Sequence, residues 1–191
     1  MRLLWLMAVV WRWSFNIWGD EMDTDFANVR PMIAADLASV LAWRNHPDVR
    51  RYMYTQHEIA EDEHRRWFER AAQDPDRHLL VFEAAGVAQG FINIHQITAG
   101  GVADWGFYLA PDVPRGTGQS LGRAALNYAF SEIGLHKVCG QALAYNERSI
   151  RFHHKLGFSQ EGVLRDQHFD GQCYHDVVCF GLIAAEWHAK S

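Results

Sequence analysis

Cysteine is scarce in this 191-residue sequence, and an excess of positive charge is missing. The three cysteines, Cys139, Cys173 and Cys179, are too few and too scattered for a disulfide framework. Lysine and arginine number 18 against 23 aspartates and glutamates, and the resulting net charge of −5 argues against nucleic-acid binding. The 11 histidines form no evident set of metal ligands, and we interpret Cys173 and Cys179 as small buried or half-buried side chains, so no metal is expected.

A long apolar run is also missing. The run from Leu3 to Trp11 is too short to span a membrane. No small-residue cleavage site follows it, which makes a secretory signal the least favoured interpretation. We expect residues 1–21 to be an apolar extension at the periphery of the fold. It would come from a misassigned start codon or be an appendage of this protein, and the alternative is an anchor that lies in a membrane interface. Residues 22–191 then form a single domain, which we place in the cytoplasm and leave open to homodimer formation.

What the sequence does contain is the pattern of one mixed α/β (α+β) domain. Hydrophobic residues make up 49% of the chain and charged residues 21%, as in globular proteins. The apolar spacing predicts strands near residues 29–32, 78–84, 89–97, 103–111, 136–144, 160–169 and 173–183. Helices are predicted over residues 33–46, 58–74, 118–133 and 146–158. The Asp170-Gly171 dipeptide predicts a hairpin between the last two strands. The strand–helix–strand unit over residues 104–144 should form the parallel part of the sheet.

Residues 114–124, PRGTGQSLGRA, place three glycines between a strand and a helix. Such a junction presents unpaired N–H groups and the positive end of a helix dipole, and glycine lets the backbone approach a phosphate. The spacing is not that of the dinucleotide-binding fingerprint, and the lysine of the P-loop is missing. From this segment alone, an ordinary glycine-rich turn is an equal alternative.

A second segment, NERSIRFHHKLGF at residues 146–158, begins with a plausible N-cap, Asn146. Together the two segments resemble the GCN5-related N-acetyltransferase (GNAT) superfamily. Arg115-x-x-Gly118-x-Ser120 resembles the pyrophosphate loop of that family, with serine where the family usually has glycine or alanine. The resemblance implies the GNAT fold: a mixed, mostly antiparallel sheet of six to seven strands, about four flanking helices and a splayed central parallel pair.

The resemblance also implies acetyl-CoA as the acetyl donor. Backbone N–H groups of the glycine segment would hold the pyrophosphate, and an N–H near Leu109 would polarise the acetyl carbonyl as in an oxyanion hole. Asn146 would bind the pantetheine arm or its local backbone. The cofactor-binding residues expected on this basis are Leu109, Arg115, Gly116, Thr117, Gly118, Gln119, Ser120, Asn146 and Ser149.

Direct acetyl transfer needs a base for the acceptor amine and an acid for the leaving thiolate. His153 stands where many relatives have a tyrosine that protonates the thiolate, so it is the candidate acid. The alternative interpretation is an ordinary surface histidine, and Tyr145 is the fallback donor. Asp104 is the candidate base because relatives often carry a carboxylate there, and a strand-edge ion pair is the alternative. His95, on the neighbouring strand, is a second candidate base.

The stretch WRNHPDVRRYMY, residues 43–54, resembles the nucleotide-sugar N-acetyltransferases of pseudaminic acid biosynthesis. That family acetylates the 4-amino group of UDP-4-amino-4,6-dideoxy-N-acetyl-β-L-altrosamine, so a UDP-amino-sugar is the expected small-molecule acceptor. Arg50 and Arg51 could bind phosphates and Tyr54 could stack on a ring, although each alone is more simply a core or solvated side chain. The expected acceptor-binding residues are Arg44, Asn45, Tyr52 and His95.

Two other functions stay open at this point. Residues 161–187 resemble the ribosomal-protein N-terminal acetyltransferases as much as any sugar enzyme, and a peptide acceptor would need an open groove instead of a walled pocket. A non-catalytic acetyl-CoA-binding module is the third possibility, and the presence of Asn146 with a plausible proton donor argues against it.

Overall fold

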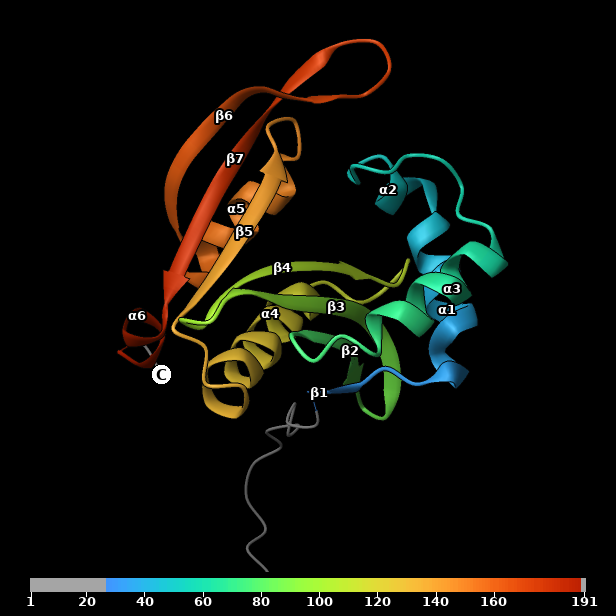
Figure 1. The fold of residues 1–191 in the computed structure, drawn as a ribbon, viewed down its shortest axis with the longest axis horizontal. Helices are drawn as coiled ribbons and strands as arrows, with labels where there is room; N and C mark the ends of the chain where they lie inside the picture. Colours follow the sequence, from blue (N-terminus) through green and yellow to red (C-terminus); the bar gives the residue numbers. More distant parts are fainter. Residues whose placement is uncertain (1–26, 190–191) are drawn as a thin grey trace, which may run out of the picture.

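The computed structural model describes residues 27–189, so the predicted extension at residues 1–21 lies outside the described part of the chain. Seven strands form one sheet in the order β1-β2-β3-β4-β5-β7-β6 (Figure 1). Within it β4 and β5 run parallel and all other neighbours are antiparallel. All seven predicted strands and the parallel unit are therefore confirmed. The strands are β1 (Asn28–Pro31), β2 (Arg77–Ala84), β3 (Val87–Thr98), β4 (Val102–Leu109), β5 (Lys137–Leu143), β6 (Ser159–Phe169) and β7 (Tyr174–Ile183).

The four predicted helices are present as α1, α3, α4 and α5, and two short helices were not predicted. The helices are α1 (Leu37–Asn45), α2 (Pro47–Arg50), α3 (Glu61–Ala71), α4 (Thr117–Asn127), α5 (Glu147–Leu156) and α6 (Ala184–His188). A 3-10 turn at Ala34–Asp36 precedes α1, and a π-helical turn at Tyr128–Glu132 extends α4. None of the helices among residues 27–189 is long and apolar enough to cross a membrane.

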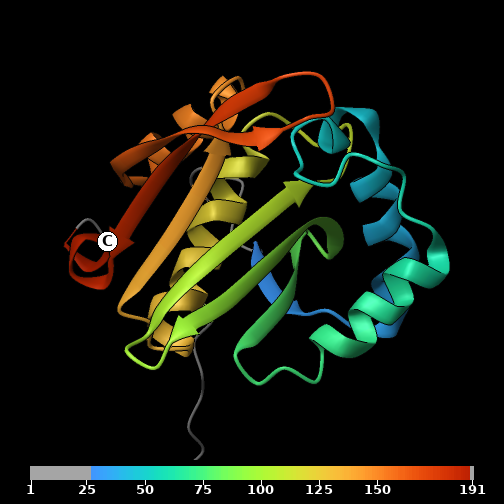
Figure 2. The same ribbon diagram turned by 45° about the horizontal axis from the view of Figure 1, so that its top comes forward.

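The sheet is covered on both faces, and the strands show why. Alternate side chains of a strand point to opposite faces, so in β2 Leu80 and Phe82 pack with α4 while Leu79 and Val81 pack with α1 and α3. Figure 2 shows α4 on one side of the sheet and the α1–α3 segment on the other. Both faces of β2 and β3 are thus fixed in the core, which makes these strands a rigid base for the neighbouring β4.

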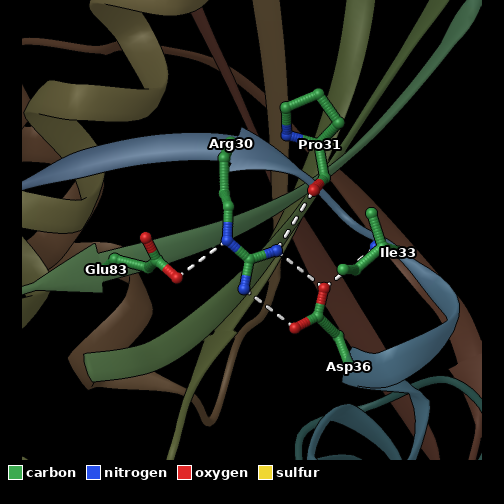
Figure 3. Close-up of polar contacts among 5 residues, drawn as sticks. All are labelled: Arg30, Pro31, Ile33, Asp36 and Glu83. Carbon is green, nitrogen blue, oxygen red and sulfur yellow. Dashed lines mark hydrogen bonds and ion pairs between the residues drawn. The ribbon is translucent and has the colours of Figure 1, made fainter. Parts of the chain in front are cut away.

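A charged cluster joins β1 to the start of α1 (Figure 3). Arg30 donates from both terminal nitrogens to Asp36 at 2.7 and 2.9 Å and from Nε to Glu83 of β2 at 2.7 Å. Asp36 also accepts from the N–H of Ile33 at 2.9 Å. The hydrogen bonds from Arg30 lower the pKa of Asp36. Bidentate arginine–carboxylate pairs have a defined geometry, so this cluster fixes the direction in which the chain leaves β1.

The β6–β7 hairpin turns at Asp170 and Gly171, as predicted, with a left-handed φ of +99° at Gly171. Asp170 Oδ1 accepts from the N–H groups of Gln172 at 2.8 Å and Cys173 at 2.9 Å. The expectation that Cys173 is buried or half-buried is wrong: it is exposed because it belongs to the turn, one residue before β7 begins. Cys179, inside β7, is half-buried as expected.

Candidate active site

A cleft opens where the two parallel strands separate. β4 and β5 are paired only at residues 102–104 and 137–139, and beyond this point they diverge (Figure 1). The cleft has a volume of about 630 Å³ and is lined by residues 104–109 of β4 and by Cys139 and Gln141 of β5. Backbone N–H and C=O groups need hydrogen-bond partners. Beyond residue 104, β4 is no longer paired with β5, so its backbone groups on that edge can bind a ligand. The predicted splay is confirmed.

The glycine segment enters α4 beside this cleft. Gly116 is the N-cap residue with a left-handed φ of +98°, and Thr117 Oγ1 donates to the carbonyl of Pro114 at 2.8 Å. Gly118 and Leu109 both line the cleft, and a Cβ on Gly118 would lie 3.6 Å from Leu109 Cδ1. The first turn of α4 therefore borders the cleft with its positive dipole end. The other expected cofactor residues, which belong to this loop and turn without lining the cleft, are Arg115, Gly116, Thr117, Gln119 and Ser120.

A second helix N-terminus borders the same cleft. Asn146 caps α5 as predicted, because its Oδ1 accepts from the N–H of Ser149 at 3.1 Å. Asn146 and Ser149 both line the cleft. Arg148 lines it too and adds a positive charge. It lies inside the motif that suggested the cofactor site, but its residue type alone did not distinguish it from a solvated arginine. Two helix N-termini and one arginine are suited to an anionic cofactor.

Asp104 is the last residue of β4 that pairs with β5, and its side chain lines the cleft. Loss of water around the carboxylate raises the pKa of Asp104, and His95, its pairing partner on β3, partly opposes that shift. A raised pKa makes a carboxylate a stronger base. His95 itself does not line the cleft, and its Nε2 lies 3.6 Å from Asp74 Oδ2.

His153 borders the cleft from within the core, with only 1% of its surface exposed. The alternative of a surface histidine is therefore wrong. Its Nε2 lies 3.2 Å from the indole nitrogen of Trp105 and its Nδ1 lies 2.8 Å from the carbonyl of Ser149. An indole N–H can only donate, so Nε2 accepts and Nδ1 carries the ring proton.

Burial lowers the pKa of His153 to about 4, so the ring is neutral near pH 7. The ring also stacks on Phe180, with 6° between the two planes. Both nitrogens are already hydrogen-bonded, and no ring proton is available to a thiolate. These contacts speak against the predicted role of catalytic acid and favour a structural role in holding β4, α5 and β7 together.

Aromatic residues form the wall of the cleft that faces away from α4. The segment after α2 crosses to β5, where the hydroxyl of Tyr54 donates to Gln141 Oε1 at 2.8 Å. Tyr145 donates to the carbonyl of Arg51 at 3.2 Å, and its ring centre lies 6.1 Å from that of Tyr52. Tyr52 and Tyr54 line the cleft, whereas Tyr145 supports this wall from behind. Aromatic side chains thus wall this side of the cleft.

Arg44 and Asn45 end α1 as expected, but their side chains hold a loop and do not line the cleft. Arg44 donates from Nη2 to the carbonyl of Thr55 at 2.7 Å. Asn45 exchanges two hydrogen bonds of 2.9 Å with the backbone of Ile59. Burial lowers the pKa of the Arg44 guanidinium. Both side chains therefore position the segment that carries Tyr54, in contrast to the direct acceptor contact expected from the sequence.

Known proteins share this sequence pattern and fold. The model of the acetyltransferase (GNAT) domain family matches residues 28–159. The chain is 26% identical to acetyltransferase PseH of Campylobacter jejuni over 133 residues, which are 69% of this chain and 82% of that protein. It is 25% identical to spermidine N(1)-acetyltransferase of Escherichia coli over 164 residues, 85% of this chain and 88% of that protein. The structure of spermidine N-acetyltransferase from Vibrio cholerae in complex with CoA and spermine has a TM-score of 0.79 at 22% identity, covering 85% of this chain and 98% of that one.

The match to the acetyltransferase family, together with the splayed parallel pair and the two helix N-termini beside it, identifies the class of this protein as a coenzyme A-dependent acyltransferase. The chain belongs to the acetyltransferase (GNAT) domain family. It is an acetyl-CoA-dependent N-acetyltransferase, as the sequence resemblance implied.

Proposed function

We propose that the acceptor is the 4-amino group of a UDP-amino-sugar and that the acetyl group passes to it directly from acetyl-CoA. Two sequence observations support this acceptor: the resemblance of residues 43–54 to the nucleotide-sugar enzymes, and the match to PseH. The single structural observation that supports it most is the aromatic wall with two arginines beside it. Flat tyrosine faces suit a uracil or sugar ring, and arginines suit a diphosphate.

The two arginines are Arg50, the last residue of α2, and Arg51, which follows it; they lie beside the lining residues Val49 and Tyr52 and do not line the cleft themselves. Arg50 Nη1 lies 3.7 Å from Glu58 Oε2, and Arg51 Nη2 lies 3.0 Å from Asp48 Oδ1. In each pair the side chain of at least one partner is largely exposed. Exposed ion pairs contribute little to stability, so a diphosphate can replace these carboxylates at small cost. The Arg51 guanidinium also sits 4.9 Å above the ring of Tyr52, which lines the cleft. Phosphate and ring contacts would thus lie next to each other.

Asp104 is the base in this proposal. It takes a proton from the acceptor ammonium, directly or through water, and the neutral amine attacks the thioester carbonyl. A backbone N–H near Leu109 stabilises the oxyanion until the C–S bond breaks and the thiolate leaves. The attacking nitrogen releases its second proton to solvent as the amide forms, and the thiolate takes a proton from solvent in the cleft. The contacts of His153 leave that ring no proton to give, and Tyr145 does not line the cleft and already donates to Arg51.

A polyamine is the second candidate acceptor, and a specific observation favours it. The cleft is lined by three carboxylates, Asp48, Asp104 and Asp112, which would attract a cationic chain. A protein N-terminus is less favoured, because the Tyr54–Gln141 hydrogen bond closes the side where a peptide would need an open groove.

A panel of acceptors at equal concentration tests the proposal. The panel contains UDP-4-amino-4,6-dideoxy-N-acetyl-β-L-altrosamine, spermidine and a short peptide with a free N-terminus, each with acetyl-CoA. We expect the UDP-amino-sugar to have the highest kcat/KM. Higher turnover of spermidine or of the peptide would reject the proposed acceptor while leaving the N-acetyltransferase activity intact.

A double variant, R50Q/R51Q, examines the phosphate contacts in the same assay. Loss of charge-assisted hydrogen bonds should raise the KM for the UDP-amino-sugar by about tenfold to a hundredfold. The KM for spermidine should stay unchanged or fall, because two positive charges near a cation are removed. The control is R65Q, which removes an exposed charge on α3 away from the cleft. An unchanged KM for the UDP-amino-sugar would show that its phosphates bind elsewhere.

A further inference from the structure

Three side chains of different chemistry converge at the turn of the β6–β7 hairpin, outside the catalytic cleft. Cys173 Sγ lies 3.3 Å from His175 Nε2, and Asp170 Oδ2 lies 2.7 Å from the same nitrogen. The thiol and the carboxylate oxygen are 3.8 Å apart. A thiolate, an imidazole and a carboxylate oxygen are the ligands that zinc takes in proteins.

The arrangement differs from a catalytic relay. In a relay the histidine bridges its partners through its two different ring nitrogens, whereas here Sγ and Oδ2 both approach Nε2. A metal ion requires ligand atoms placed around a common point, and these three atoms are placed in that way. Tetrahedral zinc with its usual bond lengths places neighbouring ligand atoms roughly 3.4–3.6 Å apart. The three distances here, 3.3, 2.7 and 3.8 Å, reach that spacing with a movement of less than an ångström.

The surroundings hold the carboxylate and the imidazole in place. Asp170 Oδ1 accepts from two backbone N–H groups of the turn, which leaves Oδ2 directed at the other two side chains. The ring of His175 packs edge-on against Tyr145, with 4.7 Å between the ring centres. Hydrogen bonds such as those to Asp170 orient metal ligands and strengthen binding.

We propose that Asp170, Cys173 and His175 bind one divalent zinc-class cation, with water as the fourth ligand. Binding replaces the thiol proton with the metal and needs a deprotonated Nε2, so affinity rises with pH.

The position of this site gives it a structural role and no part in the acetyl transfer. His175 contacts Tyr145, and Tyr145 donates to the carbonyl of Arg51 in the segment that walls the cleft. A bound cation would fix the hairpin turn against Tyr145. Acetyl transfer itself needs no metal, so the site is separate from the reaction and its test does not depend on the proposed acceptor.

Cobalt is the probe that reports on the ligands, because a tetrahedral Co²⁺ site with a thiolate has visible d–d bands and a sulfur-to-metal charge-transfer band. The full chain, reduced and metal-free, is titrated with CoCl₂ at neutral pH, and then with ZnCl₂ to displace the cobalt. We expect one equivalent of Co²⁺ with a charge-transfer band that Zn²⁺ removes. In C173S the band should vanish and the zinc affinity should fall at least about tenfold.

The matched control is C179S, which removes a half-buried cysteine of β7 outside the cluster. It should keep the band, the stoichiometry and the affinity. Far-UV circular dichroism checks that each variant is folded. H175Q, a variant of a second ligand, should lose the affinity as C173S does. Absence of the charge-transfer band in the wild-type chain, or its persistence in C173S, would overturn the proposal.

Discussion

Two ionisable side chains beside the cleft, Asp104 and His153, have surroundings that assign them different tasks. Both are desolvated, but desolvation favours the neutral form of each and so has opposite consequences for a base and an acid. It raises the pKa of Asp104, which improves a base, and lowers the pKa of His153 to about 4, which removes the charged form that an acid needs.

At the scale of single residues, we predict that D104N lowers kcat/KM at neutral pH by about a hundredfold or more, the usual size of an acid–base contribution. A base works when deprotonated, so wild-type activity should rise with pH through the raised pKa of Asp104, and this limb should vanish in the variant. Initial rates against pH measure it, and calorimetry should show unchanged acetyl-CoA affinity. D112N, which removes an equal charge from the same cleft, is the control. A D104N variant with the wild-type profile would leave the amine to lose its proton to solvent.

For His153 we predict an effect on stability. Between the ordinary histidine pKa of 6.5 and the folded value of about 4, the unfolded chain binds more protons than the folded one. The free energy of unfolding therefore has its full value above pH 6.5 and falls as the pH drops toward 4, by about 3 kcal/mol from this residue. In H153Q, urea unfolding at several pH values should lack that part of the acid destabilisation.

A catalytic acid would behave differently: H153Q would then change the pH profile of kcat and leave the slope of stability unaltered.

At the scale of the helices, two glycines of α4 are expected to serve different purposes: Gly122 allows close packing against α5, and Gly118 borders the cofactor cleft. A Cβ on Gly122 would meet Leu156 Cδ1 at 2.5 Å and Phe152 Cζ at 2.9 Å, so this glycine lets α4 approach α5. A Cβ on Gly118 would find its nearest atom, Leu109 Cδ1, at 3.6 Å. Both positions are in the same helix, so the gain in helix propensity from alanine largely cancels between them.

We therefore predict that G122A is less stable than G118A by about 1–3 kcal/mol, the usual cost of overpacking. G118A should instead weaken acetyl-CoA binding, because its methyl group enters the space between the helix and β4. Urea unfolding and calorimetry measure the two effects. Wild-type acetyl-CoA affinity in G118A would remove Gly118 from the cofactor site.

The elements also show how far the sequence could predict this molecule. Strand positions followed from alternating side chains, and the helix ends at Asn146 and Gly157 followed from local capping, which depends on neighbours in sequence. The short helix α2 was missed because Pro47, which ends α1, also begins the next helix, a position that proline favours.

Side-chain partners were harder to predict, because they depend on residues far apart in sequence. His153 is buried because Gly140 of β5 leaves room for it: a Cβ there would lie 2.5 Å from His153 Nε2. Likewise, Arg44 bonds to Thr55 across a loop whose path no local pattern indicates. The chemistry-bearing segments could thus be located from sequence, while the assignment of individual roles needed the packing.

At the scale of the whole molecule, the described sheet begins with β1. We predict that residues 1–21 can be removed without loss of the fold. Asn28 pairs with Glu83 of β2, and Arg30 joins β1 to Asp36 and Glu83. Deletion of residues 1–21 keeps all of these contacts, so we expect a folded chain with wild-type kcat/KM and an unchanged midpoint of thermal unfolding.

Deletion of residues 1–31 is the matched comparison, because it removes β1 and Arg30 as well. It exposes the edge of β2, leaves Asp36 and Glu83 without their cation, and should lower the midpoint of thermal unfolding clearly below that of the shorter deletion. Circular dichroism melts and the acetyltransferase assay on both deletions give the answer. Equal losses in the two variants would mean that residues 1–21 are needed for the fold, whereas a loss confined to the longer deletion would place the boundary of the domain between residues 21 and 31.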